Sequence, residues 1–158
     1  MTDDKKQHLS EALNWIVSLL NQHRIPYMIC GGLTAIGCGS KLELNDIDLF
    51  APGVLFQKVV ELGKKYISKP PQHYCEGWDL EYVQFIYCGV KIEVGNPNGA
   101  NFFCLSKCTI DLVEIGLPLY EANLLLDLKV TLMNRNALIK YKKTLGRPVD
   151  LLHIEVIK

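Results

Sequence analysis

The sequence has 158 residues, of which 49% are hydrophobic and 22% charged, and its 17 basic and 17 acidic residues give a formal net charge of zero. This composition is typical of a folded domain and excludes a disordered chain. The charge balance also gives no general attraction to nucleic acid or to an anionic membrane. The N-terminal stretch MTDDKKQHLSEALNW lacks the basic-then-apolar pattern of a signal peptide, and no apolar run is long enough to span a bilayer. We therefore expect a cytoplasmic protein with no membrane partner.

Apolar periodicity predicts a helix over residues 5–23, which Arg24, Ile25 and Pro26 end because proline disfavours helical geometry in the residue before it. The run YMIC (27–30) predicts a short buried strand, and LTAIG (33–37) predicts a short helix. A polar loop precedes a second strand, NDIDLF (45–50), and residues 51–66 predict a helix. The following segment, ISKPPQHYCEGWD (67–79), is rich in turn residues and predicts a loop.

The segments LEYVQFIY (80–87) and VKIEV (90–94) predict a β-hairpin with its turn at Cys88 and Gly89. Residues 108–120 hold a further candidate strand. From Glu121 to Leu145 the pattern is helical, Gly146 is a stop signal, and Pro148 begins a last short helix. This order predicts an α/β or α+β fold with a small mixed sheet flanked by helices. We expect one domain over residues 1–158, with its core at about 8–118 and a helical C-terminal segment at about 119–158.

The six cysteines predict free thiols rather than a zinc site or a set of disulfides. No Cys-x-x-Cys spacing occurs, and Cys104 and Cys108 with the distant His73 make a poor zinc set. Several cysteines lie inside apolar runs, where a thiol packs as a small apolar side chain.

The stretch LELNDIDLFAPG (42–53) places Asp46 and Asp48 one residue apart in an apolar strand. Because side chains alternate along a strand, both carboxylates point to one face while Ile47 and Leu49 point to the other. Like charges this close need a cation, or one acid must hold a proton. Mg²⁺ suits such a pair because it prefers carboxylate oxygens and keeps waters and substrate phosphates as other ligands. The alternative is a solvated face of an edge strand.

Glu93 occupies a matching context in VKIEV, between Ile92 and Val94. If that strand pairs beside residues 45–50, Glu93 joins the two aspartates, and the three carboxylates can hold one or two metal ions. Upstream, Gly31 and Gly32 lie between a strand and a helix, where glycine lets the backbone approach a phosphate and the helix N-terminus favours negative charge. This set fits in-line attack of a hydroxyl on the α-phosphorus of a nucleotide. A surface acid and an ordinary tight turn are the alternatives.

The residues CGGLTAIGCGSKLELNDIDLF (30–50), followed by VKIEV (90–94), resemble the nucleotidyltransferase superfamily related to DNA polymerase β. The family pattern is an apolar residue, Gly-Gly or Gly-Ser, a spacer, an acid-apolar-acid strand, and a later acid on a neighbouring strand. The match is closest to the minimal nucleotidyltransferases and to the nucleotidyltransferase toxins of abortive-infection systems. A looser likeness covers the C-terminal segment. Many family members carry there a Lys-apolar pair, an Arg and an Arg/Lys-x-x-Asp group. The matching residues in this sequence are Lys129, Val130, Arg135, Arg147 and Asp150.

The resemblance implies a metal-dependent nucleotidyltransferase that moves a nucleoside monophosphate from an NTP to a hydroxyl acceptor. It implies Mg²⁺ or Mn²⁺ as cofactor, held by the candidate catalytic residues Asp46, Asp48 and Glu93. The implied nucleotide contacts are Gly31, Gly32, Lys41 and Lys129.

Simpler interpretations compete with the tail and loop assignments. Lys41 is more typical of a solvated loop lysine, and Arg147 with Asp150 is more typical of an ion pair that ties down the tail. A local patch of Lys140, Lys142, Lys143 and Arg147 is a further candidate for binding phosphates.

Two other classes of function compete with the enzyme. One is a catalytically silent nucleotide-binding module that acts as an antitoxin or regulator, and the other is an interaction protein whose acids only form a surface. For the enzyme itself, an RNA 3′ end, a protein hydroxyl and a small molecule are all open as acceptor. The sequence indicates neither the NTP nor the oligomeric state.

Overall fold

The computed structural model describes residues 2–73, 80–97, 107–111 and 129–158. The strands within these residues are β1 (Met28–Cys30), β2 (Asp46–Phe50), β3 (Ile67–His73), β4 (Glu81–Tyr87), β5 (Val90–Asn96), β6 (Lys107–Asp111) and β7 (Lys129–Met133). The helices are α1 (Asp3–Gln22), α2 (Gly31–Gly37), α3 (Gly53–Gly63), α5 (Arg135–Leu145) and α6 (Pro148–Ile157), with a 3-10 turn η1 (Lys64–Tyr66) after α3.

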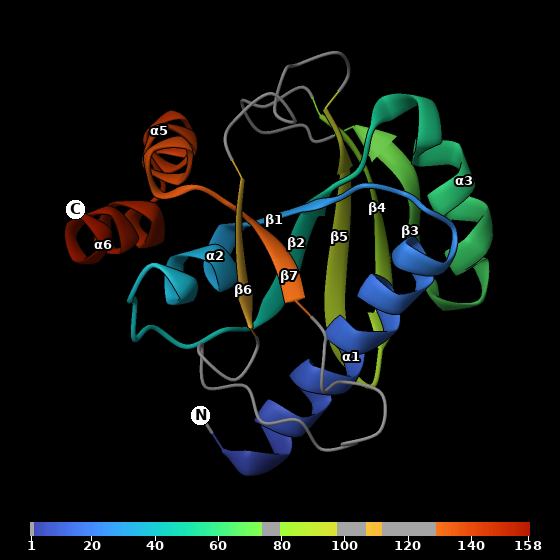
Figure 1. Cartoon of the computed structure of the whole chain (residues 1–158), viewed down its shortest axis with the longest axis horizontal. Coiled ribbons are helices and arrows are strands. Elements are labelled where there is room, and N and C mark those ends of the chain that lie inside the picture. The colour runs from blue at the N-terminus through green and yellow to red at the C-terminus, as the bar shows by residue number, and fades with distance from the viewer. Residues whose placement is uncertain (1, 74–79, 98–106, 112–128) are drawn as a thin grey trace.

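The described strands form one seven-stranded mixed sheet in the order β3-β4-β5-β2-β1-β7-β6. Helices α1 and α3 lie on one side of this sheet, and α2, α5 and α6 lie on the other (Figure 1). The fold is therefore α/β with a helical C-terminal segment, as the sequence predicted.

In the described part of the chain, two apolar clusters lie between the sheet and its helices. The larger packs α1 and α3 against strand residues that include Ile47, Leu49 and Ile92. The smaller packs α2, α5 and α6 against Met28, Cys30 and other residues of the opposite sheet face. Because the larger core takes the face that carries Ile47 and Leu49, the aspartates of β2 are left on the face of the smaller cluster.

The hairpin of β4 and β5 has the predicted two-residue turn. Tyr87 pairs with Val90, and the backbone turns at Cys88 (φ 48°) and Gly89 (φ 75°). Two successive positive φ angles are the geometry of a type I′ turn, which matches the twist of the flanking strands.

The predicted helix from Glu121 to Leu145 is wrong between Lys129 and Met133, which form β7, while residues 121–128 lie outside the described residues. Strand β7 pairs in parallel with β1 and antiparallel with β6. Val130 belongs to the larger apolar cluster and Met133 to the smaller one, so the strand is covered on both faces. A strand buried on both faces is continuously apolar, and hydrophobic periodicity cannot distinguish it from a buried helix.

The predicted loop over residues 67–79 is wrong in its first part, where Ile67–His73 form β3; residues 74–79 lie outside the described residues. Among the described strands, β3 is at the end of the sheet and pairs with β4, with register shifts between Ile67 and Lys69 and between Lys69 and Gln72, an interval that holds both prolines. Proline is tolerated on an edge strand because its missing N–H faces away from the neighbouring strand.

The remaining predictions concern cysteines, helix ends and membrane spans. Cys30, Cys38 and Cys88 are free thiols, as predicted, and Gly146 ends α5 with φ 63° in the left-handed region. None of the described helices is long and apolar enough to cross a membrane.

The turn geometry predicts that Gly89→Ala lowers the free energy of unfolding by about 1 kcal/mol, because alanine adopts positive φ at a cost. The added Cβ would contact nothing within 4 Å, so the loss would report backbone strain alone. Cys88→Asn is the control: asparagine tolerates this geometry, and its stability should match or exceed that of the parent protein. Urea unfolding midpoints measure both, and an unchanged midpoint for Gly89→Ala would contradict the turn assignment.

Candidate functional site

The predicted acids come together on two adjacent parallel strands. Strand β2 pairs with β5 so that Asp46 is opposite Lys91 and Asp48 is opposite Glu93. The residue between each pair of charged positions, such as Ile47 on β2, is buried in the larger core on the other face. The predicted pairing of the Glu93 strand beside β2 is confirmed, and the three carboxylates share one face of the sheet.

The cluster of Asp46, Asp48 and Glu93 carries more negative charge than its neighbouring cations balance. Burial, together with the negative charges of Asp46 and Glu93, raises the pKa of Asp48 from 3.8 to about 7, and Lys91 and Arg147 oppose this rise only in part. Neighbouring carboxylates repel one another when they are ionised, so their simultaneous ionisation is disfavoured. The cluster therefore favours a cation or a proton beside Asp48, and the metal site stays a prediction.

Lys91 is the charged residue of this cluster that the sequence interpretation missed. Its Nζ lies 2.9 Å from Asp46 Oδ2 and 3.7 Å from Glu93 Oε1, and 41% of its side chain is exposed. The signal was present in VKIEV, because a residue two positions before Glu93 must share its face. With the side chains in these positions, no three Asp, Glu, His or Cys residues of the described ranges are grouped closely enough to hold a metal ion.

Gly31 and Gly32 open α2 directly beside the acids. Gly31 has φ +65°, and a Cβ there would overlap Asp48 Oδ2. A Cβ on Gly32 would lie 3.0 Å from Leu44 Cδ1. The first glycine is therefore required by the approach of the Asp48 carboxylate, and the phosphate contact stays a prediction.

The two predicted lysine contacts lie in different parts of the fold. Lys41 is exposed in the loop between α2 and β2. Lys129 begins β7, which is separated from β2 by β1. Their roles in nucleotide binding stay predictions.

A cavity of ≈ 180 Å³ adjoins Asp48 and Glu93 and extends under α5. Cys30, whose pKa burial raises well above its ordinary value, and the half-exposed Arg147 also line it. An apolar cavity of about 150 Å³ is known to hold a benzene molecule, so this space suits a single ring. Most of the described residues that line it are apolar or aromatic: Leu49, Phe50, Leu80, Tyr82, Tyr141 and Leu145.

Arg147 is held at this cavity by a charged cluster at the junction of α5 and α6. Arg147 Nε donates to Asp150 Oδ2 at 2.7 Å, and Lys142 Nζ donates to Asp150 Oδ1 at 3.0 Å. Burial alone would raise the pKa of Asp150, but these hydrogen bonds hold it below its ordinary value. The predicted ion pair of Arg147 and Asp150 is thus confirmed.

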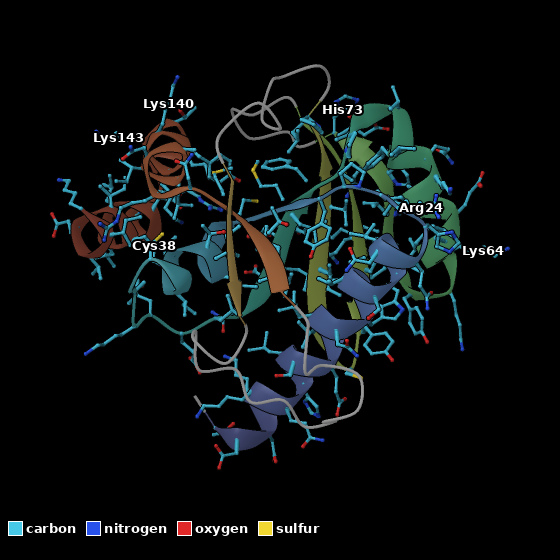
Figure 2. The ribbon with its side chains drawn as sticks, in the orientation of Figure 1. Arg24, Cys38, Lys64, His73, Lys140 and Lys143 are labelled. Carbon is cyan, nitrogen blue, oxygen red and sulfur yellow. The ribbon has the colours of Figure 1, made fainter. Side chains whose placement is uncertain are left out.

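The predicted phosphate-binding patch of Lys140, Lys142, Lys143 and Arg147 is wrong at Lys142. The Lys142 side chain is 2% exposed and paired with Asp150, so it cannot form part of a surface patch. Lys140 and Lys143 project outward from α5 (Figure 2).

Several solved structures resemble this chain in fold, although no protein-family profile matches its sequence and no curated protein matches it. A Thermotoga maritima protein assigned as a nucleotidyltransferase superposes with a TM-score of 0.67 at 14% identity, over 92% of this chain and 89% of its own. The lincosamide antibiotic adenylyltransferase LnuA, with lincomycin bound, superposes with a TM-score of 0.55 at 16% identity, over 93% of this chain and 94% of its own. ANT(2″)-Ia, in complex with adenylyl-2″-tobramycin, superposes with a TM-score of 0.54 at 15% identity, over 94% of this chain and 85% of its own.

At such low identity these likenesses show the fold. The chain therefore has the nucleotidyltransferase fold, in agreement with the motifs over residues 30–50 and 90–94.

The raised pKa of Asp48 predicts a pH-dependent loss of stability in the metal-free protein. A group whose pKa is raised by folding lowers stability as the pH rises from its ordinary value, here 3.8, through about 7. Because Asp48 is half-buried, we expect Asp48→Asn to raise the free energy of unfolding by roughly 2 kcal/mol near pH 8 and by little near pH 4. Urea unfolding in a chelator at both pH values measures this, and a gain independent of pH would contradict it.

In the cluster of Lys142, Arg147 and Asp150, we expect removal of the two cations to lower the free energy of unfolding by unequal amounts. Lys142→Met leaves Asp150 buried without one of its partners and should lower the free energy of unfolding by about 3 kcal/mol. Arg147→Met should lower it by less than about 1 kcal/mol, because the Arg147 side chain is 56% exposed. Thermal unfolding of the two variants measures the difference, and equal losses would show that burial does not distinguish the two ion pairs.

Proposed function

We propose that this protein transfers a nucleoside monophosphate from an NTP to a hydroxyl acceptor, with Mg²⁺ or Mn²⁺ as cofactor. The observation that carries the proposal is the register of β2 and β5, which brings Asp46, Asp48 and Glu93 onto one face beside the glycines of α2. The nucleotidyltransferase fold supports it, since the solved structures of similar fold include the adenylyltransferase LnuA and a protein, ANT(2″)-Ia, in complex with an adenylylated compound.

The donor set suits a hard divalent cation. Carboxylate oxygens are the ligands that Mg²⁺ and Mn²⁺ prefer, and the raised pKa of Asp48, which follows from burial and from the charges of Asp46 and Glu93, supports a cation at this cluster. Asp46, Asp48 and Glu93 would hold the metal. When bound, the metal supplies charge stabilisation at the phosphates and helps to activate the attacking hydroxyl.

The residues of the chain then have distinct roles in the reaction. The backbone N–H groups of Gly31 and Gly32 would bind the β- and γ-phosphates, where the start of α2 favours negative charge. Glu93 would accept the proton of the acceptor hydroxyl while the oxygen of that hydroxyl forms a bond to the α-phosphorus. The bond from the α-phosphorus to the bridging oxygen breaks, and pyrophosphate leaves with the bonding electrons.

A small molecule is the acceptor that the site favours. The cavity beside Glu93 measures ≈ 180 Å³ and is lined mainly by apolar and aromatic side chains, which suits one ring better than a polynucleotide. Lincomycin and tobramycin are the molecules bound in LnuA and, in adenylylated form, in ANT(2″)-Ia. For this chain, we propose a hydroxylated small molecule with an apolar portion.

A catalytically silent nucleotide-binding module is the second candidate, as an antitoxin or regulator. The observation that favours it is the ammonium of Lys91 at Asp46 and Glu93, which already neutralises part of the cluster. Such a module would bind NTP without releasing pyrophosphate.

The enzyme proposal predicts that the double variant Asp46→Asn/Asp48→Asn loses metal-dependent NTP turnover by at least about 100-fold, because the ligands for the cation are removed. The assay is transfer of label from α-labelled NTP to a panel of hydroxylated small molecules and cell extracts, with pyrophosphate release measured in parallel. Glu61→Gln is the matched control, since Glu61 is an exposed acid on α3, across the sheet.

Three outcomes are distinguishable. Turnover by the parent protein and Glu61→Gln, with loss in the double variant, supports the enzyme. Calorimetric binding of NTP without turnover supports the silent module. Unchanged turnover in the double variant would remove the proposed site.

A further inference from the structure

We propose that Lys91 is a built-in counter-ion of the carboxylate cluster, which a divalent ion must displace and which therefore sets the metal affinity of the site. This inference rests on the proposed function, because it concerns the same carboxylates. It goes further by assigning a role to a residue outside the motif.

The contacts of Lys91 place its ammonium where a cation is needed. Nζ lies 2.9 Å from Asp46 Oδ2 and 3.7 Å from Glu93 Oε1, so one positive charge joins acids from two strands. A lysine side chain is an ammonium at neutral pH, and here both carboxylates partner it. Lys91 is therefore positively charged in the resting cluster.

The strand register makes this contact intrinsic to the fold. Lys91 is directly opposite Asp46, as Glu93 is opposite Asp48, in the parallel pairing of β2 and β5. The Lys91 side chain cannot reach the other face without breaking the alternation of β5, where Ile92 is fully buried. The ammonium is thus held within reach of the acids in every molecule.

The same ammonium is an obstacle to a divalent ion. A metal bound by Asp46 and Glu93 would place two like-charged cations within a few ångströms, and their repulsion favours only one occupant. The acids as positioned around Lys91 are also not grouped closely enough for metal binding within the described residues. Metal binding therefore requires the ammonium to leave.

The lysine side chain can make that movement. It is 41% exposed, and its four-carbon stem has several rotatable bonds, so the ammonium can swing into solvent without disturbing β5. Asp46 is 32% exposed at its side chain, so the pair faces water on one side. When a metal ion displaces the ammonium, the protein loses only an ion pair that water already screens, and the ammonium becomes fully solvated.

The test is Mn²⁺ binding, measured by electron paramagnetic resonance of the free ion at low salt near pH 8. Lys91→Met removes the competing charge and should tighten the Mn²⁺ dissociation constant about tenfold, which corresponds to roughly 1.4 kcal/mol. Lys91→Arg keeps the charge and should bind Mn²⁺ within about twofold of the parent protein.

The matched control for net charge is Lys58→Met. Lys58 is an exposed lysine on α3, across the sheet from the acids, and its loss should leave Mn²⁺ affinity unchanged at the same net charge as Lys91→Met. A second readout is thermal unfolding in chelator. Lys91→Met should be less stable than the parent protein without metal and should gain more stability from Mn²⁺.

The outcomes separate this inference from the proposed function. If the parent protein binds Mn²⁺ and Lys91→Met binds it equally or more weakly, the counter-ion role is wrong while the metal site survives. If neither protein binds Mn²⁺, both the inference and the metal-dependent function are overturned. Because the readout is metal affinity, tightening by Lys91→Met supports the inference even before an acceptor is known.

Discussion

The parallel register of β2 and β5 is the constraint on which the candidate site depends. It sets Asp48 opposite Glu93 and Asp46 opposite Lys91, while Ile47 and Ile92 enter the core between α1, α3 and the sheet. Shifting one strand by a single residue would bury carboxylates and expose the core residues, so hydrophobic burial enforces the register. The burial of apolar side chains on one face of the sheet therefore holds the like-charged carboxylates together on the other face.

The elements with strong local signals were predictable from the sequence. The amphipathic α1, the Cys88-Gly89 turn and the acid-bearing β2 each follow from a short pattern that its own residues satisfy. The grouping of the acids was also predictable, because alternation in two strands leaves few arrangements once they pair. The motif likeness supplied that pairing, which the local patterns of the two strands do not specify.

Other features depended on tertiary context that no local pattern carries. Strand β7 is covered on both faces, so its apolar run looked like part of a helix. Lys142 looked like one of several surface lysines on a polar helix, and only the position of Asp150 on α6 explains its burial. Both residues of a cross-strand pair must be known before Lys91 can be assigned to Asp46.

The edge strand β3 has a consequence for how the protein behaves at high concentration. Its segment Ser68–His73 is exposed and contains Lys69 and two adjacent prolines, with an irregular register against β4. A strand from another molecule cannot form a regular ladder along such an edge, because proline offers no N–H and a charged lysine resists desolvation. The segment that was least strand-like in sequence thus disfavours the addition of a further strand at this edge.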